Sequence, residues 1–88
     1  MHDTKALLIT RNGLRCMLCG KQFPYRQLQW HHIIPKYVAK RDGGKPDDSY
    51  ENGALLCLTC HMVVHDYTYW DKEYEELMKI IRSNKKPR

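Results

Sequence analysis

Residues 57–65 read Cys57-Leu58-Thr59-Cys60-His61-Met62-Val63-Val64-His65. In this stretch a Cys-x2-Cys pair runs directly into two histidines that are four residues apart. We expect a helix from about Thr59 to His65, because residues four apart on a helix share one face and can bind the same cation. Cys60 precedes His61 and is rotated from it by about 100° around the helix. This one segment can therefore serve a cysteine site on one side and a histidine site on another.

A second Cys-x2-Cys pair, Cys16 and Cys19, lies nearer the N-terminus. Two such pairs supply the four thiolates of a tetrahedral zinc site once the fold brings them together. This set leaves no position for water, so we expect a structural Zn²⁺ site that contributes much of the folding free energy. Disulfides and free thiols are the alternatives, and His61 in place of one thiolate is another. The predicted zinc ligands are Cys16, Cys19, Cys57 and Cys60.

Two adjacent histidines, His31 and His32, lie in a stretch from Leu28 to Ile34 that is rich in β-branched and aromatic residues. We predict this stretch as a strand stopped by Pro35. Neighbouring strand residues point to opposite faces, so the two histidines cannot do the same job. One can bind a cation with the helix histidines, while the other stays free as a general base. The plainer alternative is that they are packed core residues.

The rest of the chain predicts flanking elements. Asp3–Asn12 is typical of a short helix capped by Asp3, with a strand over Ala6–Ile9 as the alternative. Residues 36–49 are polar and contain two glycines and a proline, so we predict a loop. A second short strand is expected over Ala54–Leu56.

A last helix is predicted over about residues 69–83, with Thr68-Tyr69-Trp70-Asp71 as a capping box at its start. One apolar stripe at helical spacing follows, and we expect it to pack on the core. Its members are Trp70, Tyr74, Leu77, Met78 and Ile81. The basic tail at residues 84–88 is expected to be disordered.

Length and charge set broader bounds. The 88 residues are expected to form one domain, residues 1–88, with a core small enough to need a staple such as a metal. The net charge of +5 favours a polyanionic partner such as nucleic acid, although the same charge would also simply keep a small protein in solution. We predict no signal peptide and no membrane span, and therefore a cytoplasmic protein in which paired cysteines bind zinc.

Together these motifs resemble the HNH nucleases of the ββα-metal superfamily over residues 16–65. The family's signature is a histidine that ends the first strand, an asparagine before the second strand and a histidine on the helix. The matching residues are His32, Asn52 and His65. Many members also carry a metal ligand just before the first signature histidine, here His31, and some carry a histidine one turn before the last, here His61.

The resemblance implies an α+β fold, namely a small ββα-metal domain with a structural zinc knuckle, flanked by an N-terminal and a C-terminal helix. One departure is Gly53, where members often have leucine. We expect this glycine to loosen the loop before the second strand without touching a catalytic role.

The resemblance also implies a DNA endonuclease that leaves 5′-phosphate and 3′-hydroxyl ends. His32 would take a proton from the attacking water, and Asn52 would hold His32 in orientation. The phosphate would be contacted by one divalent cation, Zn²⁺, Mn²⁺, Ni²⁺, Co²⁺ or Mg²⁺, held by His31, His61 and His65. We expect the backbone phosphates to meet the basic residues of the loop, which are Lys36, Lys40, Arg41 and Lys45.

Two rival interpretations stay open at this level. A non-catalytic zinc module that binds DNA or RNA would keep the cysteines and the basic charge but need no histidine site. A secreted toxin nuclease would be expected to carry further domains. Sequence specificity from a protein partner, nicking against double-strand cleavage, and the oligomeric state are not determined by these motifs.

Overall fold

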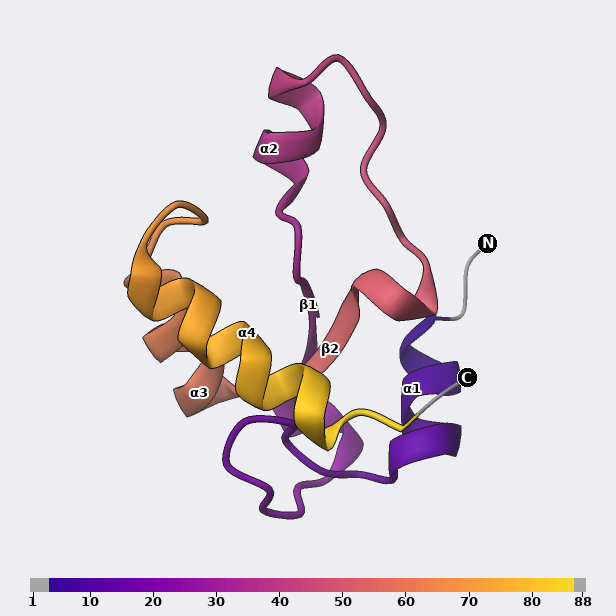
Figure 1. Cartoon of the computed structure of the whole chain (residues 1–88). Coiled ribbons are helices and arrows are strands. Elements are labelled where there is room, and N and C mark those ends of the chain that lie inside the picture. The colour runs from indigo at the N-terminus through magenta and orange to yellow at the C-terminus, as the bar shows by residue number, and fades with distance from the viewer. Residues whose placement is uncertain (1–3, 87–88) are drawn as a thin grey trace.

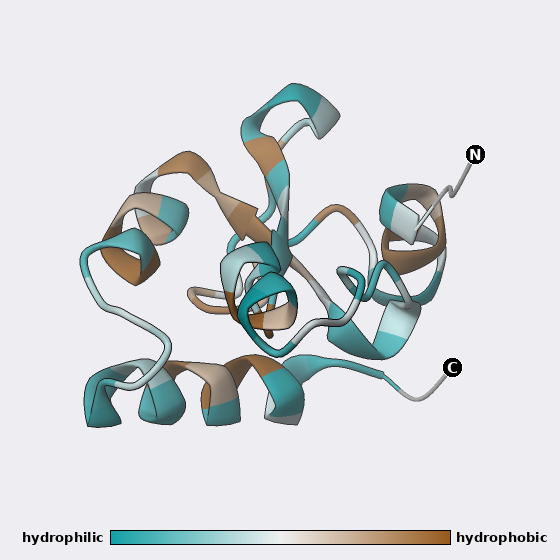
Figure 2. Ribbon diagram, turned by 90° about the horizontal axis from the view of Figure 1, so that it is seen from above, coloured by the Kyte–Doolittle hydropathy of each residue, from teal (hydrophilic) through white to brown (hydrophobic). Residues whose placement is uncertain are grey.

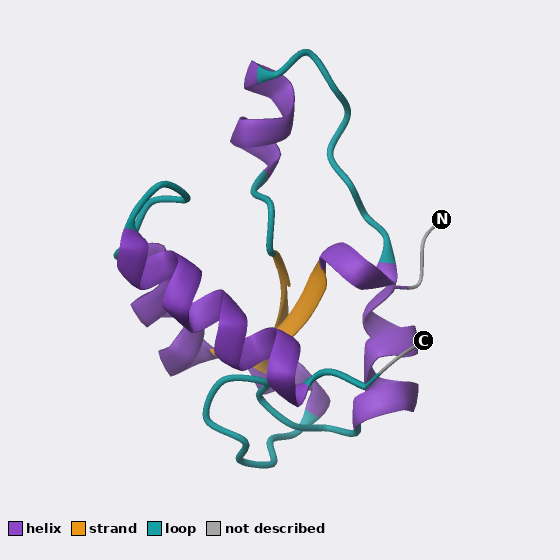
Figure 3. Ribbon diagram, in the orientation of Figure 1, coloured by secondary structure: helices purple, strands orange, loops and turns teal. Residues whose placement is uncertain are grey.

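The computed structural model describes residues 4–86. Within that range the chain folds into a two-stranded antiparallel sheet with four α-helices and two 3-10 turns around it (Figures 1 and 3). The elements are α1 (Thr4–Asn12), η1 (Tyr25–Gln27), β1 (Leu28–His32), α2 (Lys36–Arg41), η2 (Tyr50–Asn52), β2 (Gly53–Cys57), α3 (Leu58–His65) and α4 (Lys72–Asn84). The predicted α+β class is confirmed.

The two strands and α3 form a ββα unit. β1 pairs antiparallel with β2 in a register that places His32 opposite Gly53 and Leu28 opposite Cys57. Every residue of β2 is buried, and α3 begins directly after it at Leu58. Because α3 follows β2 without an intervening loop, the histidines of α3 are held next to β1.

The hydrophobic core lies where the helices meet the strands. α1 and α3 lie on opposite sides of the strands, and α4 runs across a third side (Figures 1 and 2). The hydrophobic side of α4 faces the rest of the molecule, with Met78 and Ile81 fully buried (Figure 2). These residues join a cluster that includes Leu8, Leu28, Leu55, Leu56 and Val64. Among the described residues, no helix is long and apolar enough to span a bilayer.

The first helix is confirmed over the described residues, whereas its predicted cap, Asp3, lies outside them. The prediction of a loop across residues 36–49 is wrong for its first part, because residues 36–41 form α2. Pro35, in an extended conformation, precedes the helix, and Val38 is buried on the inner side. β1 ends at His32, so the predicted strand to Ile34 stopped by Pro35 is two residues too long, and Pro35 instead lies at the N-cap of α2. A proline suits the start of a helix because it lacks a backbone N–H, which has no partner there in any case.

The last helix begins at Lys72, three residues later than predicted. Half of the predicted capping box is present, since the backbone N–H of Thr68 donates to Asp71 Oδ2 at 2.7 Å. Trp70 precedes the helix and is 58% exposed, so its prediction as a core residue is wrong. Helical spacing places a side chain on the buried stripe only within the helix itself.

The predicted disorder of the tail is wrong for Lys85 and Lys86. The Lys85 ammonium donates to the carbonyl oxygens of Tyr50 and Gly53, and the Lys86 backbone N–H donates to Asn12 Oδ1 at 2.7 Å. The chain after α4 therefore runs back to α1 (Figure 1). Residues 87–88 of the predicted tail lie outside the described residues.

Candidate metal centres and active-site cleft

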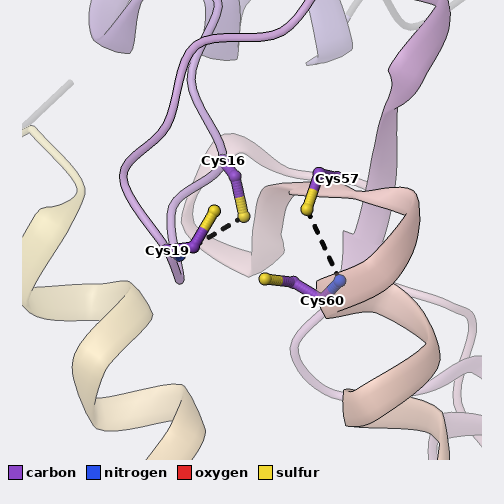
Figure 4. A group of neighbouring side chains, drawn as sticks. All are labelled: Cys16, Cys19, Cys57 and Cys60. Carbon is purple, nitrogen blue, oxygen red and sulfur yellow. Dashed lines mark hydrogen bonds between the residues drawn. The ribbon is translucent and has the colours of Figure 1, made fainter.

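The four cysteines come together from two parts of the chain. Cys16 and Cys19 lie in the loop after α1, whereas Cys57 ends β2 and Cys60 lies in the first turn of α3 (Figure 4). Their four sulfur atoms lie within 4.8 Å of one another. Sulfur ligands of a tetrahedral zinc are about 3.8 Å apart, so this donor set fits the ion with a small contraction. The cysteines are positioned like a zinc knuckle.

Backbone N–H groups point at the cysteine sulfurs. Leu18 and Cys19 donate to Cys16 Sγ at 3.4 and 3.5 Å, and Cys60 donates to Cys57 Sγ at 3.5 Å. Burial alone would raise the pKa of Cys16, but backbone N–H groups outweigh it and lower the pKa to about 7. Burial and the neighbouring thiols raise the pKa of Cys60. The site thus has one thiol, Cys16, prepared to ionise, while the Cys60 thiol needs the positive charge of a metal to do so.

Three histidines form a second group of metal-binding type. His31 comes from β1, and His61 and His65 come from α3. One ring nitrogen of each lies within 4.8 Å of the others, and the Nε2 atoms of His61 and His65 are 2.9 Å apart. Burial, and then the neighbouring histidines, lower the pKa of His31 to about 3 and also lower that of His61. Neutral imidazoles with facing nitrogens are what a shared cation requires. His61 lies in this group and not among the cysteines, so it does not replace one of the thiolates of the zinc site.

Partner groups select the tautomer of two of these rings. The Tyr74 hydroxyl donates to the Ile33 carbonyl at 2.6 Å, so its oxygen accepts from His31 Nε2–H at 2.9 Å. That arrangement leaves the lone pair of His31 on Nδ1. His61 Nδ1 donates to Gln29 Oε1, which leaves its lone pair on Nε2. Both rings are therefore held with one nitrogen free to bind a metal.

His32 lies on the opposite face of β1 from His31. Its ring stacks on Trp30 with centroids 4.6 Å apart, and its Nε2 is 2.7 Å from Asp48 Oδ1. A carboxylate oxygen can only accept, so Nε2 carries the hydrogen and Nδ1 has the lone pair. His32 Nδ1 is thus available as a hydrogen-bond acceptor. It does not belong to the three-histidine group and is not needed to bind a metal there.

Asn52 ties together the segments on either side of His32. It is buried, its Oδ1 accepts from the Ile34 backbone N–H at 2.8 Å, and its Nδ2 donates to the Asp47 carbonyl at 2.7 Å. The first bond holds the chain just after His32, and the second holds the chain just before Asp48. Both partners in the His32–Asp48 pair are therefore anchored by one amide.

The expected loosening at Gly53 does not occur. Gly53 is buried and is the first residue of β2, paired with His32. A Cβ atom at this position would lie 2.7 Å from Trp30 Nε1. Trp30 therefore fills the space that a side chain at residue 53 would take, and it uses that position to support the His32 ring.

A cleft of about 490 Å³ opens around the end of β1. It is lined by the four histidines, and Lys36 and Lys40 of α2 also line it. Arg41 lies outside the lining and has its guanidinium over the Trp70 ring. Lys45 is exposed in the loop after α2 and does not line the cleft. The structure thus brings two of the four predicted phosphate-binding residues to the cleft.

Sequence reasoning missed three residues of the site, Gln29, Asp48 and Tyr74. Gln29 could have been found, since it is two residues before His31 and lies on the same strand face. Asp48 and Tyr74 carry no local signal, because their contacts join residues 16 and 43 positions apart in the chain.

Comparison with known protein families gives a match that covers most of the cleft residues. A family model described as HNH endonuclease matches residues 16–66, which is more than half of the 88 residues. None of the curated proteins compared with the chain matches it. The matched segment contains the cysteine pairs, all four histidines of the cleft and Asn52. The resemblance and the fold inferred from the sequence are confirmed.

Proposed function

The chain belongs to the HNH endonuclease family, and from its cleft we propose that it is a metal-dependent DNA endonuclease that hydrolyses phosphodiester bonds to 5′-phosphate and 3′-hydroxyl ends. Family membership supports nuclease activity on nucleic acid in general. The finer proposal rests on the different positions of the four histidines. His31, His61 and His65 each place a ring nitrogen close enough to share a cation. His32 lines the same cleft and is hydrogen-bonded to the Asp48 carboxylate.

Two metals belong to this proposal. Cys16, Cys19, Cys57 and Cys60 would hold a structural Zn²⁺, since four thiolates form a closed tetrahedral site. His31, His61 and His65 would hold the catalytic divalent cation. When bound, that cation supplies Lewis-acid stabilisation of the negative charge that grows on the phosphate and the leaving oxygen. Reduced thiols suit the cytoplasmic location expected from the sequence.

His32 is the proposed general base. With its Nε2–H held by Asp48, the ring has only Nδ1 available to take a proton from water. The Asp48 carboxylate also stabilises the imidazolium that forms when the proton arrives. Asn52 is a positioning residue, because its hydrogen bonds anchor the chain on both sides of the His32–Asp48 pair. General-base catalysis of this kind contributes roughly 10²–10⁴-fold to a rate.

Charge supports a nucleic-acid substrate. The chain carries 15 Lys and Arg against 10 Asp and Glu, and Lys36 and Lys40 lie at the rim of the cleft. Contacts from such side chains to phosphates position the backbone without reading its sequence. Sequence specificity would then come from a protein partner, and a single cleft would cut one strand at a time, which favours nicking.

Digestion of supercoiled plasmid with a panel of divalent cations tests the proposal. We expect conversion to open circles with zinc, nickel, cobalt or manganese at concentrations where magnesium is inactive, because three imidazoles form a softer site than oxygen ligands. DNA ligase should reseal the nicks, since it requires 5′-phosphate and 3′-hydroxyl ends. Binding of DNA without cleavage in any cation, by a protein that holds one metal per chain, would identify a zinc-binding module instead.

A further inference from the structure

Exposed aromatic side chains gather on one side of the cleft. Tyr37 of α2 is 51% exposed, Trp70 before α4 is 58% exposed, and Tyr67 between α3 and α4 is 38% exposed. Tyr37 and Tyr67 line the cleft itself. The rings of Tyr37 and Trp70 have centroids 6.0 Å apart, so Trp70 extends the aromatic surface away from the histidines.

This surface is held in place by its own contacts. The Tyr37 hydroxyl accepts from the backbone N–H of Tyr69 at 3.1 Å, which joins α2 to the segment before α4. The Trp70 ring meets Tyr69 edge-on at 5.5 Å. The guanidinium of Arg41 lies over the Trp70 ring, with its carbon 5.1 Å from the centroid. The indole thus has a defined position and a cation beside it, yet more than half of it stays exposed.

Positive charge surrounds the same aromatic residues. Arg41 lies on Trp70, and Lys36 and Lys40, in the same helix as Tyr37, line the cleft. Aromatic rings interleaved with basic side chains are the surface that single-stranded nucleic acid binds, since bases stack on the rings while cations meet the phosphates. Bases within a duplex are already stacked on one another, and only an unpaired base has a free face to offer.

We propose that Tyr37, Trp70 and Arg41 form a stacking surface for an unpaired nucleotide next to the scissile phosphate. The preferred substrate would then have a single-stranded segment beside the cut, as in a fork, a flap or a gap. This inference rests on the proposed nuclease function and specifies the substrate class of that same cleft. It also accounts for a tryptophan that occupies an exposed position before α4 instead of a place in the core.

Binding is measured in a His32→Ala background, which removes the proposed base and prevents cleavage during the titration. The probes are a fluorescein-labelled single strand of about 12 nucleotides and the blunt duplex of the same sequence, followed by anisotropy at about 0.1 M salt. Trp70→Leu keeps apolar bulk but removes the stacking ring, and Trp70→Phe restores a ring. Tyr25→Ala is the matched control, because Tyr25 is 54% exposed with Lys5 over its face at 3.8 Å and does not line the cleft.

We expect Trp70→Leu to weaken single-strand binding by about 5- to 100-fold, with duplex binding changed less than about twofold. Trp70→Phe should recover most of the loss, and Tyr25→Ala should change neither affinity. Equal loss for both probes, or no loss for either, would overturn the stacking surface. If the wild-type protein cuts plasmid but Trp70→Leu in the His32→Ala background binds the single strand normally, the stacking inference alone fails. If the His32→Ala protein itself binds neither probe, the proposed nuclease function fails together with the stacking inference.

Direct contact of Trp70 with a base is tested by its fluorescence. Adding unlabelled single strand should quench the emission of the His32→Ala protein, because stacked bases quench indole. The quench should be clearly smaller in Trp70→Phe, whose remaining tryptophan, Trp30, lines the cleft beside the histidines. A quench of equal size in the two proteins would show that no base reaches Trp70 and would contradict the proposal even where affinities agree with it.

Discussion

Replacing Tyr74 with phenylalanine removes one oxygen atom from the most constrained part of the histidine site. Tyr74 is 3% exposed, and its ring packs in the core beside Met78 and Ile81. Its hydroxyl donates to the Ile33 carbonyl and accepts from His31 Nε2–H. Burial raises the pKa of Tyr74, so the hydroxyl remains a protonated donor at neutral pH. The substitution therefore leaves the packing unchanged and deletes the two short hydrogen bonds of the hydroxyl, together with its long contact to the His32 carbonyl at 3.5 Å.

The magnitude follows from the two partners that lose their hydrogen bonds. A buried polar group left unpaired costs about 1–3 kcal/mol, so two such groups give an expected loss of about 2–6 kcal/mol in the free energy of unfolding. Net stability of a small domain is about 5–15 kcal/mol, so the variant still folds. His31 would no longer be held in the tautomer that frees Nδ1. Loss of such an orienting partner lowers metal affinity by about 10- to 100-fold.

Urea unfolding and calorimetric titration with Mn²⁺ measure the two effects. Tyr37→Phe is the matched control, because it deletes a tyrosine hydroxyl at the same cleft that accepts one exposed backbone N–H. We expect that control to stay within about 0.5 kcal/mol of the parent and to bind the cation normally. Parent-like stability together with parent-like affinity in Tyr74→Phe would refute the assignment of the His31 tautomer.

Three further predictions concern the zinc site, acid stability and the partner of the base. Cys16→Ala should release the zinc and unfold the domain, because structural zinc contributes about 10–16 kcal/mol; a folded variant by circular dichroism would contradict a structural role. The pKa of His31 is lowered to about 3 from 6.5, so the unfolded chain takes up a proton first and stability falls as the pH drops below 6.5. Without added cation, protonation of His31 should lower the free energy of unfolding by about 2 kcal/mol between pH 7 and pH 5. A His31→Gln protein whose stability has the same pH dependence would exclude His31 as the cause. Asp48→Ala should slow cleavage by about 10- to 100-fold with cation binding unchanged, whereas the exposed Asp42→Ala should cut normally; equal rates in the two variants would remove Asp48 from the site.

Local spacing predicted the parts of the site that lie within one element or next to it. Two cysteines with two residues between them make a knuckle, two histidines four positions apart share a helix face, and adjacent strand residues point to opposite faces. For that reason the cysteine group and the separation of His31 from His32 could be predicted before the fold was known. Gln29 was within reach of the same argument and was missed.

The remaining parts depend on tertiary structure. Asp48 reaches His32 only because Asn52 folds the intervening loop back onto the end of β1. Tyr74 reaches His31 only because α4 crosses the sheet. Trp70 matched the helical stripe in sequence but lies before the helix begins, where the spacing no longer fixes a direction. Lys85, read as part of a solvated tail, is held by two carbonyl groups of the chain around η2.

The nicking rate of supercoiled plasmid, compared between the parent and His32→Ala with the same added cation, tests the central claim most directly. His32 is the fourth histidine of the cleft and contributes no nitrogen to the three-histidine group, so its loss should leave both metals bound. We predict a rate lower by roughly 10²–10⁴-fold with unchanged metal content and DNA affinity. A His32→Ala protein that nicks plasmid at the parent rate would contradict the account.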